Sequence, residues 1–409
     1  MTAVVGLLNK KGVALVADSA VTRSRSGHDM KVTKNGNKMI RVSQCPPICI
    51  MVTGSASFLD HPWDIIIREY RMQNGENAGY ETVKDCVDNF FDFLRTYDNL
   101  WHYPGEHDWV RKNIRRLLDH VSSEIMPDAK ERDEEGVLID PFTYEEELKM
   151  VLQECLKDSP AYSKGIFFQD YGLEEFIDFA IKDFKEELDL QVYKPHDPWN
   201  TYCDPEILNK HYKNFLKALF NQITGRLSQN ETQLIFTGYG IKEEYPSLIP
   251  VTVYEGFDRR PNHFIESKDI VEILPGEKEA AICPFAQVDV MESVLSGVSA
   301  EWKYKFLKNI HPEKKIKNKL ENLILSNQQK NINGWEEALK DYDLREMADL
   351  ALSLIDLTGF HRILTFQSEG VGGELDVAVI TKEEGFTWLS RKSWYHHKDI
   401  GGRYGYMGV

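Results

Sequence analysis

The sequence lacks the long apolar run that a membrane-spanning helix requires. Such a helix needs ~20 consecutive apolar residues, and no stretch of the 409 residues approaches that length. The start also lacks a basic flank followed by a long apolar segment, which is the pattern of a secretory signal peptide. These absences predict a cytoplasmic protein without a membrane partner.

Cysteine is scarce and scattered. The sequence has six cysteines and no C-x-x-C motif: Cys45, Cys49, Cys86, Cys155, Cys203 and Cys283. Zinc sites and disulfide frameworks both depend on patterned cysteine spacing. The adjacent pair His396 and His397 also has no partner at metal-binding spacing. We therefore expect buried thiols, no metal and no cofactor.

Positive charge is in deficit. The formal net charge is −16, so the chain as a whole is repelled by phosphate backbones and by anionic membrane surfaces. Nucleic acid is excluded as an expected partner. In contrast, 42% of the residues are hydrophobic and 11% aromatic, which is enough apolar material for a packed globular core.

Short β-rich runs open the chain. Residues 3–9 and 13–18 predict two strands joined by a hairpin, and residues 39–42 and 48–54 predict two more, separated by a turn at Pro46 and Pro47. We expect these four strands to form one meander.

Helical periodicity replaces the strands from about residue 57 and continues for roughly 170 residues. Apolar residues recur on one helical face in segments such as 114–125 and 208–223. Strand patterns return at 233–240, 248–257, 280–283 and in the final segment after 373, with helices at 287–309 and 343–358. This order favours an α+β fold rather than alternating βαβ units.

The domain organisation that follows has one interrupted core. We expect residues 1–74 and 230–395 to form the core, 75–229 a mainly helical insertion, and 396–409 a flexible tail. Length alone fits two separate domains equally well.

A threonine stands directly behind the initiator methionine. A threonine hydroxyl becomes a useful nucleophile when a base takes its proton, and the α-amino group of the same residue can be that base. Its reference pKa of about 7.7–8.0 leaves a useful neutral fraction near pH 7. Thr2 can act in this way only if Met1 is removed, and many proteins begin Met-Thr without any catalytic reason.

The opening of the chain resembles the N-terminal nucleophile hydrolases of the proteasome β-subunit type. Thr2, Gly12 and the triplet Ala17-Asp18-Ser19 match the order and spacing of that family, and a glycine-rich turn before the last strands extends the match. The resemblance implies a divergent bacterial-type member with a four-layer αββα sandwich. It also implies a threonine peptidase that acts through an acyl-enzyme on Thr2, without a cofactor.

The same resemblance assigns three further catalytic residues. Lys38, chosen over Lys31 and Lys34, would lower the pKa of the amine, and Asp18 would hold that lysine charged and oriented. The backbone N–H of Gly54, expected at a helix start, would donate to the oxyanion.

The resemblance also implies a substrate-binding surface. Val21, Ile40, Val52 and Ala56 would form an apolar pocket for a substrate side chain, and the backbone of Thr22 would pair with an extended peptide. A peptide or amide substrate and a homo-oligomer are the implied partners, with a regulatory or unfoldase partner left open.

Two departures from the family keep other readings open. Pro284-Phe285-Ala286 stands where the family has a supporting Ser-Gly, and Val371 replaces the serine of the late turn. The aspartate that precedes this serine in the family has no clear match, and Glu369 or Ser368 could substitute. These changes favour a catalytically silent subunit that serves as an assembly scaffold. An enzyme of the same fold that cleaves a small-molecule amide is the other alternative, since fold does not set the substrate.

Overall fold

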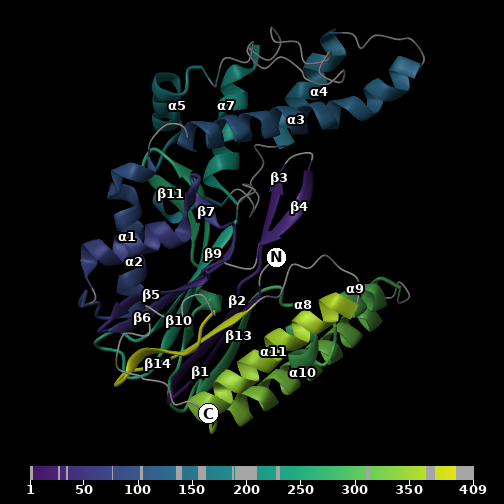
Figure 1. The fold of residues 1–409 in the computed structure, drawn as a ribbon. Helices are drawn as coiled ribbons and strands as arrows, with labels where there is room; N and C mark the ends of the chain where they lie inside the picture. Colours follow the sequence, from purple (N-terminus) through teal and green to yellow (C-terminus); the bar gives the residue numbers. More distant parts are fainter. Residues whose placement is uncertain are drawn as a thin grey trace.

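Antiparallel β-sheets form the centre of the computed structural model (Figure 1). The structure describes residues 3–25, 28–33, 36–75, 77–101, 105–134, 141–154, 163–186, 188, 210–226, 231–309, 314–364 and 374–392. The expected combination of antiparallel sheets with helices is confirmed.

The first sheet joins the two ends of the described chain. It has five strands in the order β13-β1-β2-β14-β15, and every neighbouring pair is antiparallel. Strands β1 and β2 are buried along their whole length, as continuous apolar runs require. The bounds are β1 Ala3–Asn9, β2 Gly12–Asp18, β13 Ala280–Ala286, β14 Leu375–Thr381 and β15 Gly385–Ser390.

The second sheet lies against the first. Its order is β11-β10-β9-β6-β5, with β12 paired to β10. The bounds are β5 Met39–Gln44, β6 Pro47–Gly54, β9 Thr232–Gly238, β10 Ser247–Phe257, β11 Arg260–Phe264 and β12 Val271–Glu272. Side chains of both sheets share one buried cluster, to which Leu15, Met51 and Ile235 belong.

The predicted four-strand meander is wrong. Strands β1 and β2 belong to the first sheet, whereas β5 and β6 belong to the second. A hairpin of β3 (Val21–Arg25) and β4 (His28–Thr33) lies between them in the chain. Apolar strands buried on both faces carry the same sequence pattern in either sheet, so the pattern cannot assign them to one.

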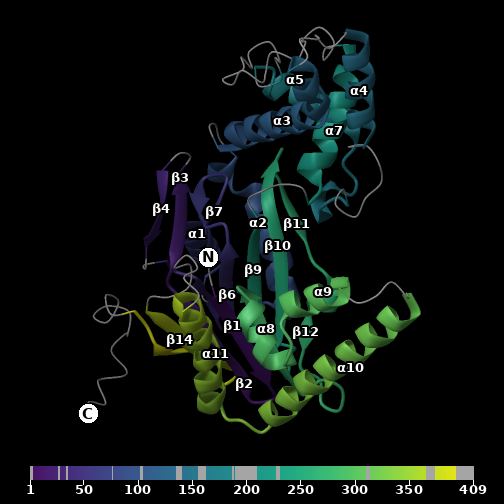
Figure 2. The same ribbon diagram turned by 90° about the vertical axis from the view of Figure 1, so that its right-hand side faces the viewer.

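Helices cover the outer face of each sheet (Figures 1 and 2). Helix α11 (Leu344–Leu364) packs on β1, β2 and β14, with α8 (Asp289–Ser296), α9 (Ala300–Asn309) and α10 (Lys314–Leu339) beside it. Helices α1 (Trp63–Asn74) and α2 (Val83–Thr96) pack on the second sheet. The sequence pattern did not predict α10.

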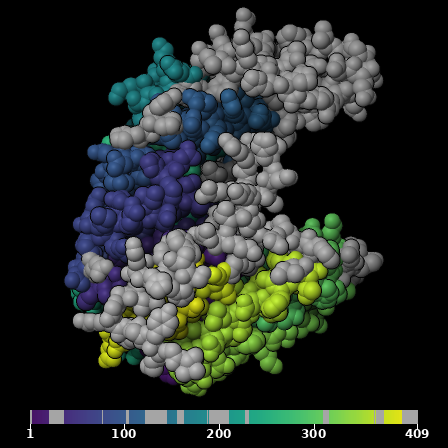
Figure 3. Space-filling model, in the orientation of Figure 1, coloured from purple at the N-terminus to yellow at the C-terminus, as the bar shows by residue number. Residues whose placement is uncertain are grey.

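The remaining helices gather at one end of the second sheet. They are α3 Gly105–Glu134, α4 Pro141–Glu154, α5 Leu173–Asp183 and α7 Tyr212–Thr224, with short elements η1 Asp98–Leu100, η3 Ile166–Phe168, η5 Ser267–Asp269, β7 Ser57–Phe58 and β8 His61–Pro62. In the space-filling view, α3 lies at the opposite end from α10 and α11 (Figure 3).

A cluster of aromatic rings packs these helices against the second sheet. The ring of Phe257, the last residue of β10, contacts Trp109 of α3, Phe168 of η3 and Phe176 of α5. Helix α2, which lies beyond residue 75, also packs on β9, β10 and β11. The domain limits given above stay a prediction. No helix among the described residues is both long enough and apolar enough to span a bilayer.

Candidate active site

A buried ion pair lies at the end of strand β2. The ammonium Nζ of Lys38 lies 2.6 Å from Oδ1 of Asp18, the last residue of that strand. Lys38 is 5% exposed and Asp18 is 1% exposed. Asp and Lys side chains are almost never so buried unless they are paired. The pairing predicted for these two residues is present in the structure.

The start of strand β1 contacts the same carboxylate. The backbone N–H of Ala3 donates to Asp18 Oδ1 over 2.9 Å. One oxygen therefore accepts from both the lysine and the first described residue of the chain. Thr2, which is bonded to that backbone nitrogen, lies outside the described residues.

Burial dominates the protonation equilibrium of Lys38. Loss of solvent around the ammonium lowers the pKa of Lys38 below its usual value. The Asp18 carboxylate opposes this by raising that pKa, while the nearby cation of Lys392 lowers it further. The pKa of Lys38 is therefore the balance between burial and Lys392, which lower it, and Asp18, which raises it.

Gly54 is the last residue of β6 and pairs with Thr232 of β9. The prediction that it begins a helix is wrong, because β7 and β8 follow it and α1 begins only at Trp63. Its φ of +83° is strained for residues with a side chain, and the carbonyl oxygen of Glu231 occupies the space of a Cβ atom. Glycine is therefore required here by backbone geometry.

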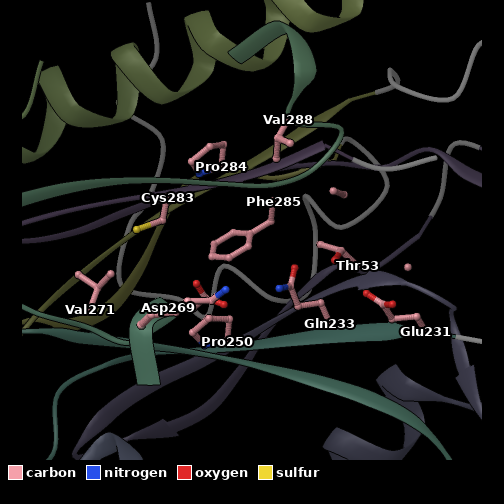
Figure 4. A pocket seen from close by; sticks show the side chains of 13 residues that line it. Thr53, Glu231, Gln233, Pro250, Asp269, Val271, Cys283, Pro284, Phe285 and Val288 are labelled. Atoms are coloured by element: carbon pink, nitrogen blue, oxygen red, sulfur yellow. The ribbon is translucent and has the colours of Figure 1, made fainter. Parts of the chain in front are cut away.

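A cavity of about 530 Å³ lies beside Gly54, between the ends of the two sheets. Strand β13 contributes Phe285 and Ala286 on one side, and Gln233 of β9 lies opposite, as Figure 4 shows for the labelled side chains. Ala286 pairs with Ala3, so the cavity wall adjoins the start of β1. The lining residues are Thr53, Gly54, Glu231, Gln233, Pro250, Lys268, Asp269, Val271, Cys283, Pro284, Phe285, Ala286 and Val288.

The substrate-binding residues expected from the sequence occupy other positions. Val52 is buried in the cluster beneath the second sheet, Ile40 packs against that cluster, and Ala56 is exposed in a bend after β6. The backbone of Val21 and Thr22 belongs to β3, and their side chains lie outside the described part. Their role in binding stays a prediction.

Sequence reasoning missed the polar wall of the cavity. Glu231 immediately precedes β9 and Gln233 is the second residue of that strand, so the two side chains lie on one face of a largely apolar segment. That alternation is a signal that the sequence contains. No sequence pattern indicated that Asp269 lies at the cavity, because the turn that follows β11 brings η5 there.

The thiol in the cavity wall does not provide a nucleophile. Burial raises the pKa of Cys283 to about 12, and the thiolate is the nucleophilic form of cysteine. Over the described ranges, no group of three or more His, Cys, Asp or Glu side chains is arranged to hold a metal ion. The polar groups at this end of the sheets include the Lys38–Asp18 pair, backbone N–H groups and the side chains of the cavity wall, Glu231, Gln233 and Asp269.

Comparisons with known proteins give a distant likeness. No family model and no curated protein matches the chain. Among solved structures, it is similar to an Anbu (Gly-1) mutant from Hyphomicrobium sp. strain MC1, with 10% identity, coverage of 97% of this chain and 90% of that chain, and a TM-score of 0.29. Anbu (ancestral β-subunit) from Yersinia bercovieri shows 9% identity, 96% and 89% coverage, and a TM-score of 0.28.

These results correct the family assignment made from the sequence. The assignment to the proteasome β-subunit type is wrong as made, because the similar solved structures are of Anbu, described as an ancestral β-subunit. The TM-scores of 0.29 and 0.28 carry no inference about activity. Any function therefore has to be argued from the residues at the site.

Proposed function

We propose that the chain is an amide hydrolase whose nucleophile is the hydroxyl of Thr2, exposed after removal of Met1. The observation that carries the proposal is the convergence on Asp18, whose Oδ1 accepts both from Lys38 and from the backbone N–H of Ala3. A cation held within reach of the residue before Ala3 is what an N-terminal threonine needs to become reactive.

The proposed reaction has two stages. The neutral α-amine of Thr2 takes the proton of its own hydroxyl, whose oxygen attacks the amide carbon, and the N–H of Gly54 donates to the oxyanion. The amine then returns the proton to the leaving nitrogen, and an acyl-enzyme remains on Thr2. Water hydrolyses this ester with the same amine as base. One oxyanion donor is typically worth ~10²–10³ in kcat.

The ion pair supports this chemistry through electrostatics. A lysine cation beside the α-amine disfavours its protonation, which lowers the pKa of the amine and raises its neutral fraction at pH 7. Asp18 keeps Lys38 in place, and both side chains are excluded from water, so screening is weak. Neither residue needs to exchange a proton with the substrate.

The substrate class is a peptide or a smaller amide. Strand β3 carries Thr22, whose backbone would pair with an extended peptide. Val21 and the exposed Ala56 would contact an apolar side chain of that peptide, whereas Val52 and Ile40 pack in the core beneath the second sheet. The cavity beside Gly54 offers space for the leaving group. A compact amide that fills this cavity is the small-molecule alternative.

The proposal also covers the layer architecture, the oligomeric state and the cellular location of the protein. Buried clusters on both faces of each sheet support a four-layer αββα sandwich. We propose a cytoplasmic homo-oligomer, which is the location and assembly expected from the sequence.

Intact mass tests the proposal directly. Protein purified from a native-like host is weighed before and after treatment with a peptide epoxyketone, which targets N-terminal threonine. The expected result is a mass without methionine and a single adduct, which Thr2→Ala abolishes and which Thr96→Ala, an exposed threonine at the end of α2, retains. Retention of Met1 with no adduct contradicts the proposal.

A catalytically silent scaffold is the second candidate. The observation that favours it is the pairing of Ala3–Val5 with Pro284–Ala286, a stretch of β13 without a hydroxyl side chain. In that case the purified protein assembles, keeps Met1 and forms no adduct.

A further inference from the structure

A second lysine, Lys392, is buried two residues beyond the end of β15. It is 1% exposed, and an ammonium so far from water needs partners for its three donors. Its Nζ lies 3.2 Å from Asp376 Oδ2, donates to Asn37 Oδ1 over 3.2 Å, and also donates to the carbonyl oxygen of Gly36. The backbone N–H of Lys392 donates to Asp376 Oδ1 over 3.1 Å.

The partners of Lys392 are neighbours of both members of the Lys38–Asp18 pair, in the chain for Lys38 and in the sheet for Asp18. Gly36 and Asn37 are the two residues immediately before Lys38. Asp376 lies on β14 opposite Ala17, the residue before Asp18. Lys392 therefore connects the segment that carries the lysine to the strand that neighbours the aspartate.

The two ion pairs also share an electrostatic environment. The charged groups that act on Lys38 are Asp18 and Lys392, and those that act on Lys392 are Asp376, Arg391 and Asp18. Each lysine has its own buried carboxylate, so the site holds two cations and two anions at the same end of the first sheet. A lysine on the surface would be screened by solvent, so it would neither keep a fixed position nor exert a comparable electrostatic effect on Lys38.

We propose that Lys392 and Asp376 are positioning residues for the hydrolysis. They hold residues 36–38 so that the Lys38 ammonium stays at Asp18, and they add a second buried positive charge at the same end of the first sheet. This inference rests on the proposed function and extends it to a pair that the sequence pattern did not indicate.

The test compares inactivation by a peptide epoxyketone across pH 5–10, followed by intact mass. The double variant Lys392→Met/Asp376→Asn removes both charges together, since removal of one would leave the other buried and unpaired. Inactivation at saturation is expected to slow by roughly tenfold, the lower end of the effect seen for residues that orient metal ligands, while the epoxyketone concentration that half-saturates the enzyme stays near that of the wild type. Lys330→Met on the exposed face of α10 is the control and is expected to match the wild type.

The pH profile separates positioning from general structural support. The double variant removes the Lys392 cation and the Asp376 anion together. Of this pair, Lys392 is the charge that acts on the Lys38 ammonium. Its loss is therefore expected to raise the pKa of the neighbouring amine and to move the acidic limb of the inactivation profile to higher pH. Lys392→Arg keeps the charge and is expected to restore the wild-type limb. If the double variant does not fold, Lys392→Gln/Asp376→Asn replaces it, because the amide of the glutamine can still donate to Gly36 while neither buried charge is left unpaired.

The outcomes are distinguishable. An unchanged rate and an unchanged limb in the neutral variants, with a wild type that reacts, overturn this inference and leave the proposed function in place. Loss of rate without movement of the limb, or movement that Lys392→Arg does not reverse, also overturns it. A wild type that forms no adduct at any pH overturns the proposed function and this inference with it.

Discussion

Gly54 ends strand β6 at the point where the carbonyl oxygen of Glu231 occupies the space that a Cβ atom would need. Strand β9 therefore approaches the backbone of Gly54 more closely than any side chain would allow. This contact forms one edge of the cavity between the sheets. Backbone packing therefore requires glycine at position 54, independently of any contribution of its N–H to catalysis.

Gly54→Ala is expected to destabilise the protein by about 2 kcal/mol or more, because an alanine at φ +83° is strained and its methyl group displaces β9. Chemical denaturation measures the free energy of unfolding. Gly334→Ala, in α10 with open space around it, is the control and is expected to stabilise by roughly 1 kcal/mol. Equal effects of the two changes would contradict this account of Gly54.

The Lys38–Asp18 pair is expected to show strong coupling. Lys38→Met or Asp18→Asn alone leaves one buried charge without its partner, at a cost of about 3–5 kcal/mol. The double variant removes both charges and is expected to be more stable than either single variant, while adduct formation with the epoxyketone is lost in all three. Denaturation of the four proteins gives the coupling energy, and additive effects would show that the pair does not act as a unit.

Ala286→Gly is expected to stabilise the protein by about 1 kcal/mol. Ala286 has φ +67°, a region that costs residues with a side chain about 1–2 kcal/mol and glycine little. The matched control is Ala281→Gly in the regular part of β13, which is buried and is expected to destabilise. Thermal unfolding measures both, and a destabilised Ala286→Gly would refute the assignment of strain to this residue.

His263 is expected to make the fold sensitive to acid. Burial against Phe91 lowers the pKa of His263 to about 4, from 6.5 in the unfolded chain. The folded state therefore binds this proton less well, so the stabilisation is complete above pH 6.5 and is lost as the pH falls toward 4, by about 3 kcal/mol in all.

Denaturation between pH 4 and 7 of the wild type and of His263→Phe measures this contribution. The variant keeps a ring beside Phe91 and is expected to lose less stability with acid than the wild type. His361→Gln on the exposed surface of α11 is the control and is expected to follow the wild type. Parallel curves for wild type and His263→Phe would assign the acid sensitivity to other groups.

Local patterns predicted a large part of the fold. The hairpin of β1 and β2, the apolar runs of β6, β9 and β10, and the helical stripes of α3 and α7 were all read from residue spacing. Helix α10 was missed because its residues 314–339 are mostly polar and present no wide apolar stripe. The β3–β4 hairpin was missed for a related reason, since residues 21–33 have little of the apolar alternation of a half-buried strand.

The sequence by itself determined the local elements and one ion pair at this site. The contact between Asp18 and Lys38 was expected from the resemblance of the opening of the chain to a known family, and the structure contains it. Only the tertiary structure decided that β5 and β6 join a different sheet from β1 and β2, and that Lys392 lies beside Asn37 across 355 residues of chain. Such contacts depend on how the two sheets stack. Stacking is determined by the burial of whole sheet faces, and the local residue pattern does not specify which face packs against which.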